Sequence, residues 1–205
     1  MIRAGMPLPL GAYERCGGVN LAVFSRHATQ VSLLLFDAPL AEAPCRSIDL
    51  DPAQHRTGDI WHVWIESLDR GAIYAWRVNG PYQPEQGHRF NPHKVLLDPY
   101  AAALVGTECW DFACACGFEA TSPARDLSFS REDNSRWQAK CLVGDGAFDW
   151  QGDQRPHHTW ADTLIYETHV RGFTVHPSAA VEQPGTYLGL VEKIPYLKEL
   201  GITAV

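Results

Sequence analysis

The chain has 205 residues, a formal net charge of −7, 45% hydrophobic residues and 20% charged residues. This composition is ordinary for a globular protein and excludes disorder over most of the chain. The negative charge argues against a nucleic-acid or anionic-membrane partner, because both need clustered Lys and Arg. The first residues contain no apolar run of signal-peptide length, so we expect a cytoplasmic protein with reduced cysteines.

The N-terminal part reads as a series of short strands separated by Gly, Pro and Asp. β-branched and aromatic residues recur in these segments, and helical periodicity is absent. Such spacing is typical of an antiparallel β-sandwich. The expected strands are 19–24, 31–36, 60–65 and 73–78.

Alternation along two of these strands separates core from surface. Trp61 shares a face with hydrophobic residues, which predicts a core position. Trp64 shares the other face with His62, and we expect that face to be more exposed. In the next strand Arg77 marks the polar face, so Trp76 lies on the opposite one.

Residues 81–105 contain several prolines and read as a packed connector, and residues 106–159 read as a loop-rich crossing. Three cysteines cluster in this crossing, Cys109, Cys114 and Cys116. Zinc is conceivable, but structural zinc sites usually space their paired cysteines more widely. We favour an irregular segment that tolerates cysteine, and we predict neither a metal nor a cofactor.

The pattern then changes. Residues 163–170 are predicted to form a strand, residues 189–200 a helix, and residues 202–205 the start of another strand. Pro195 predicts a break of the helix into two, with the proline in a first turn, and Gly201 is a natural C-terminal cap. A strand, a helix and a strand in this order indicate a parallel sheet.

Several long segments resemble one family in the right order. The most specific is 87–101, GHRFNPHKVLLDPYA. Two further segments are 74–82, YAWRVNGPY, and 162–174, DTLIYETHVRGFT. The chain resembles the N-terminal part of bacterial glycogen debranching enzymes and isoamylases in glycoside hydrolase family 13. Those enzymes carry a β-sandwich, carbohydrate-binding module family 48, before a (β/α)₈ barrel.

The resemblance implies a mostly β chain. We expect an immunoglobulin-like antiparallel β-sandwich over 1–105, the interdomain crossing over 106–159, and the first βαβ piece of a truncated (β/α)₈ barrel over 160–205. The implied function is α-1,6-glucan debranching in glycogen breakdown by a retaining mechanism, with a branched α-glucan such as glycogen or limit dextrin as partner.

The resemblance places the catalytic carboxylates of this family on later barrel strands. We therefore assign no catalytic residue here and expect the chain alone to be inactive. Glu132, Asp133, Asp149 and Asp153 are interpreted as solvated or structural carboxylates. Two residues could border the barrel mouth of a longer enzyme, and packing there is the favoured role: Glu167 and His169.

Aromatic rings can stack on sugars, and Trp64 and Tyr82 are the candidates in the sandwich, although core packing is favoured for Trp64. The segment 89–100 is expected to brace the sandwich against the barrel, with Arg89 and Asp98 as hydrogen-bonding groups around buried aromatics. The bracing residues are Arg89, Phe90, Asn91, Asp98 and Tyr100.

Two alternatives stay open. The chain could act as a stand-alone glucan-binding or docking module without activity, or it could belong to a branching or trehalose-releasing relative. The segment after His169, VRGFT, is more similar to the debranching group.

Overall fold

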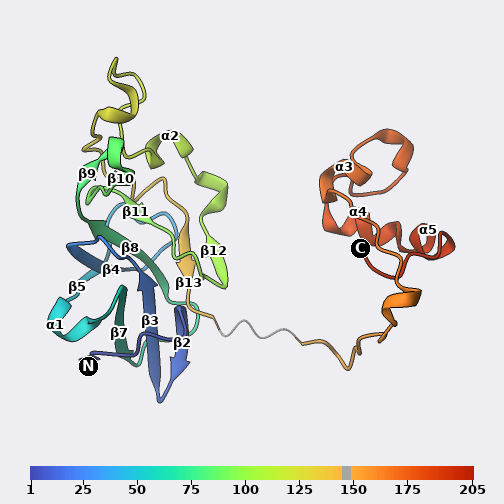
Figure 1. Cartoon of the computed structure of the whole chain (residues 1–205), viewed down its shortest axis with the longest axis horizontal. Coiled ribbons are helices and arrows are strands. Elements are labelled where there is room, and N and C mark those ends of the chain that lie inside the picture. Colours follow the sequence, from blue (N-terminus) through green and yellow to red (C-terminus); the bar gives the residue numbers. More distant parts are fainter. Residues whose placement is uncertain (145–148) are drawn as a thin grey trace. The chain divides into compact units, whose positions relative to one another are not determined.

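The computed structural model describes residues 1–144 and 149–205 (Figure 1). The chain divides into two compact units, Met1–Phe148 and Asp149–Val205. In the described part, no helix is both long and apolar enough to cross a membrane.

The first unit contains two large antiparallel β-sheets and a small two-stranded one. One has the strand order β1-β7-β3-β2, with β6 paired on β7. Its strands are β1 (Ile2–Arg3), β2 (Gly11–Arg15), β3 (Gly18–Phe24), β6 (Arg56–Thr57) and β7 (Ile60–Glu66). The other has the order β12-β13-β8-β4-β5, with β11 paired on β8. Its strands are β4 (Gln30–Phe36), β5 (Arg46–Asp49), β8 (Ile73–Asn79), β11 (Val95–Leu96), β12 (Ala103–Val105) and β13 (Lys140–Leu142).

The two sheets pack on one hydrophobic core. Inward-facing residues of both sheets meet there, among them Leu21, Trp61, Leu33, Tyr74 and Trp76. The aromatic members fit a pleated, buried surface well, and β-branched residues such as Val19 and Val63 pack beside them. The four strands expected from the sequence are confirmed, as is the core position of Trp61.

Short elements complete the first unit. β9 (Tyr82–Gln83) and β10 (His88–Arg89) form a small hairpin around the 3₁₀ turn η1 (Pro84–Gln86). The remaining helices and turns are α1 (Pro52–His55), η2 (Thr107–Cys109), α2 (Phe112–Ala115) and η3 (Arg125–Leu127).

The segment expected as an interdomain crossing is partly built into the sandwich. It is loop-rich, as expected, but β13 pairs with β8 and with β12. Lys140 at the start of β13 is buried, and its ammonium donates hydrogen bonds to the carbonyl oxygens of Pro39 at 2.7 Å and Ser135 at 2.6 Å. The first unit therefore extends well past residue 105.

The second unit consists of short helices. They are η4 (Trp160–Asp162), α3 (Val170–Thr174), η5 (Pro177–Ala179), α4 (Tyr187–Glu192) and α5 (Ile194–Glu199). The predicted break into two helices is confirmed, with Pro195 in the first turn of α5. Gly201 follows with a φ of 78°, a left-handed conformation that glycine adopts without strain.

The expectation of a regular strand over 163–170 is wrong. Only Ile165 pairs, as an isolated parallel bridge to Ala204, and Val170 already lies in α3. The bridge carries a hydrogen bond of 2.9 Å from the Tyr166 amide to the Ala204 carbonyl oxygen. A strand needs consecutive ladder bonds to a neighbour, and this segment has one rung.

Candidate functional site

The segment 89–100 is fastened to the sandwich by two buried polar side chains. The first is Asn91, whose amide nitrogen donates to the carbonyl oxygens of Gly117 at 2.9 Å and Ser130 at 2.8 Å. Its amide oxygen accepts from the backbone nitrogen of His93 at 2.9 Å. Asn91 thus ties the segment to the loops of residues 106–144.

The second is Asp98. Its carboxylate accepts hydrogen bonds from the Tyr74 hydroxyl at 3.0 Å and from the Trp76 indole at 3.2 Å. Burial, together with the Asp98 charge, raises the pKa of Tyr74. Burial likewise raises the pKa of the Cys141 thiol to about 12, and the Cys141 sulfur accepts from the Asp98 amide. Asp98 thus bonds two buried aromatic side chains, and its part in bracing the sandwich against a barrel stays a prediction.

The other residues expected to brace the sandwich are more exposed. Arg89 was expected to form hydrogen bonds around buried aromatic residues. Its guanidinium instead forms an exposed ion pair of 2.8 Å with Asp126. Phe90 is half-buried and Tyr100 is exposed. Their contact with a barrel stays a prediction.

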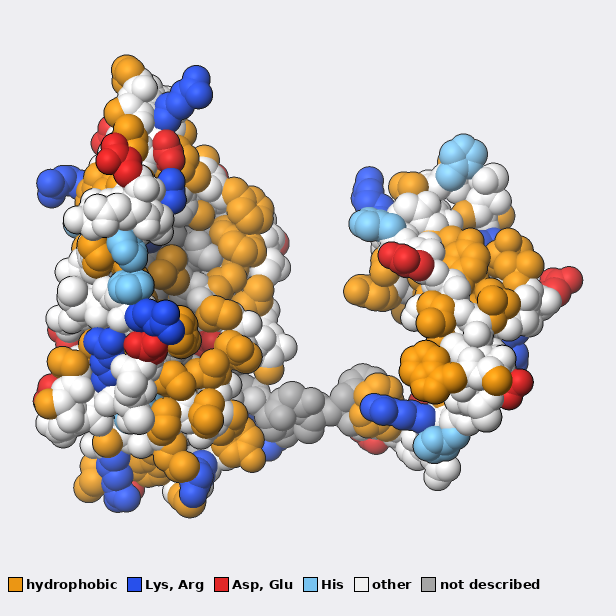
Figure 2. All heavy atoms as spheres, viewed as in Figure 1, with side chains coloured by type: hydrophobic (Ala, Val, Ile, Leu, Met, Phe, Trp, Pro, Cys, Tyr) orange, Lys and Arg blue, Asp and Glu red, His pale blue; other side chains and the backbone are white. Residues whose placement is uncertain are grey.

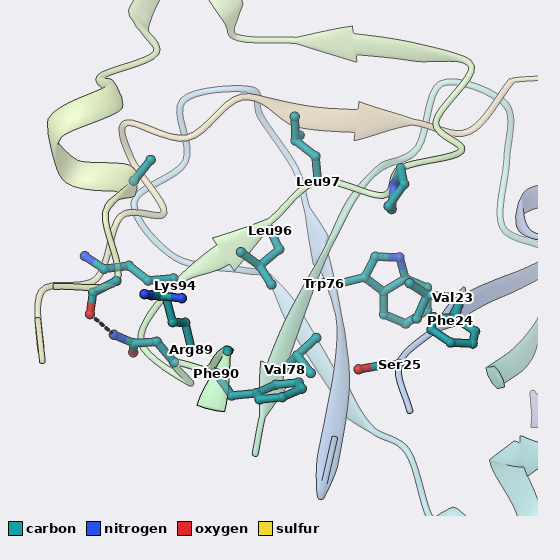
Figure 3. Close-up of a pocket in the computed structure, with 15 residues that line it drawn as sticks. Val23, Phe24, Ser25, Trp76, Val78, Arg89, Phe90, Lys94, Leu96 and Leu97 are labelled. Atoms are coloured by element: carbon teal, nitrogen blue, oxygen red, sulfur yellow. Dashed lines mark hydrogen bonds between the residues drawn. The ribbon is translucent and has the colours of Figure 1, made fainter. Parts of the chain in front are cut away.

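Phe90 lines an apolar groove of about 460 Å³ at the edge of the sandwich (Figure 3). Trp76 and Val78 of β8, Phe24 of β3 and Leu96 of β11 also line it. Sugar sites need converging hydrogen-bonding groups, whereas this lining is mainly hydrophobic. The groove therefore suits an apolar partner better than a glucan.

The face of β7 that carries His62 and Trp64 is not exposed, contrary to expectation. Trp64 is only 9% exposed and its indole donates to the Arg15 carbonyl oxygen at 2.9 Å. The guanidinium of Arg3, on the edge strand β1, lies 5.0 Å from the centre of the Trp64 ring. This cover leaves Trp64 little free surface for stacking on a sugar.

Tyr82, the other candidate for sugar stacking, is half-buried in the β9–β10 hairpin. Its hydroxyl donates to the carbonyl oxygens of Asp126 and Ser128. Its ring meets Phe129 edge to face, with centres 4.8 Å apart. Tyr82 thus secures the 125–129 turn to the hairpin, and sugar binding by Tyr82 stays a prediction.

The cysteine-rich segment has no metal geometry. Among the described residues, no three His, Cys, Asp or Glu side chains are arranged to hold a metal ion. Burial raises the pKa of the Cys114 thiol, and the neighbouring carboxylates of Asp111 and Glu132, which the thiol contacts, raise it further.

Exposed aromatic rings around α2 were not singled out from the sequence. Phe112, the first residue of α2, is 68% exposed and stacks on Trp110 with ring centres 4.5 Å apart. Trp137 is 40% exposed, and the adjacent backbone is joined by a hydrogen bond of 2.9 Å from the Asp111 amide to the Trp137 carbonyl oxygen. We call Trp110, Phe112 and Trp137 the aromatic patch.

In the second unit, the two barrel-mouth candidates are both exposed. The ring nitrogen Nδ1 of His169 accepts from the Gly172 amide at 3.1 Å, so this histidine caps the start of α3. Their place at a barrel mouth stays a prediction.

Comparison with known proteins gives a consistent result. Residues 9–101 match carbohydrate-binding module 48, the isoamylase N-terminal domain. A glycogen debranching enzyme of Yersinia enterocolitica is 42% identical over 213 aligned positions, which cover 100% of this chain and 29% of that enzyme. A glycogen debranching enzyme of Yersinia pseudotuberculosis is 44% identical, with 98% and 29% covered. The chain thus spans 29% of the length of these relatives.

Solved structures agree on the fold. The product complex of a multi-modular glycogen-degrading pneumococcal virulence factor, SpuA, gives a TM-score of 0.63 at 23% identity, over 98% of this chain and 19% of that one. The GBS pullulanase SAP in complex with maltotetraose gives 0.59 at 21% identity, over 95% and 23%. The resemblance noted in the sequence is confirmed: the chain is homologous to part of the Yersinia glycogen debranching enzymes, and its residues 9–101 match the carbohydrate-binding module 48 family.

Proposed function

We propose that this chain is the sandwich-bearing part of an α-1,6-glucan debranching glycoside hydrolase that acts on glycogen or limit dextrin. The observation that carries the proposal is the 42% identity to a glycogen debranching enzyme, which extends over the whole chain and not only over the module. The cytoplasmic location stays a prediction from the sequence.

Residues 160–205 are proposed to begin the catalytic (β/α)₈ barrel. The parallel bridge from Ile165 to Ala204 supports this, because parallel neighbours are joined through a crossover helix, and α4 and α5 lie between the two bridged residues. Barrel strands pair on both sides, which gives Ile165 and Ala204 further partners in a longer protein.

The chain alone is proposed to be inactive. A retaining glycosidase needs two carboxyl groups about 5–5.5 Å apart, one of them a nucleophile. Two of the four carboxylates considered from the sequence have structural partners: Asp133 pairs with Arg77 at 2.7 Å and accepts from the Ser135 amide, and Asp149 accepts from the Gln151 amide at 2.8 Å.

A chimera tests the proposal. The matching residues of the Yersinia enterocolitica debranching enzyme would be replaced by this chain, and release of linear maltodextrin from limit dextrin would be measured. We expect the chimera to debranch within about tenfold of the parent rate, which corresponds to about 1.4 kcal/mol of transition-state stabilisation. We expect the 205-residue chain to release none. A chimera that unfolds cooperatively like the parent but does not debranch would contradict the proposal.

A second candidate is a glucan-binding module that works without a barrel. The closed hydrophobic core of the first unit favours it, since this unit has what it needs to fold alone. Debranching by the chimera separates the two candidates, because a module that never joined a barrel has no reason to support one.

A further inference from the structure

The aromatic patch of Trp110, Phe112 and Trp137 is an exposed surface that the sandwich does not use for its own packing. Neither Phe112 nor Trp137 belongs to the hydrophobic core of the first unit. Hydrophobic side chains gather on the surface over α2 and the chain next to it (Figure 2). Exposed apolar patches rimmed by polar groups mark binding surfaces.

The patch is held rigidly by its surroundings. The Asp111 carboxylate accepts from the Ala113 amide at 2.8 Å and caps α2, which fixes Phe112 at the first helical position. At the other end of the helix, the buried Lys94 donates to the Cys114 carbonyl oxygen at 2.9 Å. A surface that is already ordered loses little entropy when a ligand binds.

Trp137 is positioned in the same way. The guanidinium of Arg136 lies 4.9 Å from the centre of the Trp137 ring, and Arg136 also pairs with Glu42 at 2.5 Å. Trp110, which stacks on Phe112, has a buried indole nitrogen without a hydrogen-bond partner among the described atoms. An unpaired buried donor costs free energy.

The charged residues around the aromatic patch, which form its rim, indicate which class of ligand it can bind. Three exposed charged residues surround the α2 segment: Asp111 directly precedes Phe112, Arg136 lies over the Trp137 ring, and Glu132 contacts Cys114 of α2. Charges of both signs disfavour a strongly anionic ligand and make an apolar protein contact costly, because they would lose water on burial. A neutral polyol fits, since its apolar ring face can lie on an aromatic ring while its hydroxyl groups bond the rim.

We propose that the aromatic patch is a binding surface for α-glucan chains, carried by the loop segment around α2 and not by the sandwich strands. This inference rests on the proposed function, and it names a site for the substrate class of that function. Trp64 and Tyr82 take no part in it.

Affinity electrophoresis of the 205-residue chain in native gels, with and without glycogen, tests the inference. Phe112→Ala and Trp137→Ala are each expected to weaken glycogen retardation about two- to tenfold, as expected for loss of one aromatic contact. Tyr13→Ala is the matched control, because Tyr13 on β2 is also an exposed aromatic residue, 54% exposed and outside the patch. Added maltoheptaose should abolish the retardation.

Thermal unfolding of each variant keeps the test interpretable, because removing an exposed ring should leave the unfolding transition unchanged. The inference is overturned if glycogen does not retard the wild-type chain. It is also overturned if Tyr13→Ala weakens retardation as much as Phe112→Ala, or if Phe112→Ala changes only self-association of the chain. An active chimera together with an unretarded chain would show that the inference fails while the proposed function holds.

Discussion

The two units of the chain differ in what they do with their hydrophobic residues. In the first unit, Trp61, Tyr74 and Trp76 fill the space between two sheets. In the second, Leu197 is the only buried hydrophobic side chain among the described residues, whereas Leu188 and others are exposed. Two sheets enclose their own core, but short helices with one parallel bridge have no second layer to pack against. The first unit therefore encloses its own core, whereas the second leaves most of its large hydrophobic side chains exposed.

The largest expected effect comes from the sandwich core. Trp76→Ala removes a ring that is almost fully buried and whose indole bonds Asp98, so the free energy of unfolding should fall by about 3–5 kcal/mol. Tyr196→Ala in α5 removes an exposed ring and should change it by less than about 0.5 kcal/mol. Urea titration followed by fluorescence measures both. Equal losses in the two variants would contradict the comparison.

A smaller loss is expected at the buried carboxylate. Asp98→Ala leaves the Tyr74 hydroxyl and the Trp76 indole without their acceptor in the core. An unsatisfied buried donor costs about 1–3 kcal/mol. The free energy of unfolding should fall by about this amount, and the urea concentration at the midpoint should fall with it. Asp69→Ala, at an exposed position of the same unit, is the control and should leave the midpoint in place. A midpoint shared by Asp98→Ala and the wild type would show that the network does not stabilise the sandwich.

The smallest effect is a pH dependence on the outer side of the same unit. Burial opposes the charge of Asp133, but hydrogen bonds from Ser135 and the charge of Arg77 outweigh it and hold the pKa of Asp133 below its ordinary value of 3.8. The lowered pKa means that the unfolded chain binds the proton more readily. The stabilisation by Asp133 is therefore fully present above pH 3.8 and lost as the pH falls through the folded-state pKa.

Asp133→Asn checks this. The variant should be slightly less stable than the wild type at pH 6, because an exposed ion pair contributes little, and the difference should disappear in strong acid. Thermal unfolding at a series of pH values measures the difference. A gap between the two proteins that widens as the pH falls would have the wrong sign.

Much of the sandwich could be predicted because its strands carry the pattern that packs them. The exposure of the Trp64 face could not, since its cover comes from Arg3 on a strand of two residues, too short to show a pattern. β13 was missed for a related reason. It begins with Lys140, a residue type that usually marks the surface, and its burial depends on the carbonyl oxygens of Ser135, five residues before it, and of Pro39, far away in the sequence.

The candidate site was predictable only where a residue lies in a segment that the sequence analysis had recognised. Hydrogen bonds between Asp98 and buried aromatic residues were expected because Asp98 lies in the segment that carries the family resemblance, 87–101. The aromatic patch was not, because Phe112 and Trp137 lie far apart in irregular sequence, and the hydrogen bond from the Asp111 amide to the Trp137 carbonyl oxygen leaves no pattern there. In the second unit, the apolar run around Ile165 predicted a strand, but a strand is completed by its neighbours and not by its own residues.

Amide hydrogen exchange of residues 187–199, the helices α4 and α5, tests the central claim most directly. It would be measured in the 205-residue chain and in the chimera with the Yersinia enterocolitica enzyme. If the second unit is the start of a barrel that the rest of the longer protein covers, these amides should exchange quickly in the chain and at least about 100-fold more slowly in the chimera. The amides of β3, β7 and β8 should be equally protected in both proteins. Equal exchange of α4 and α5 in the two proteins would contradict the account.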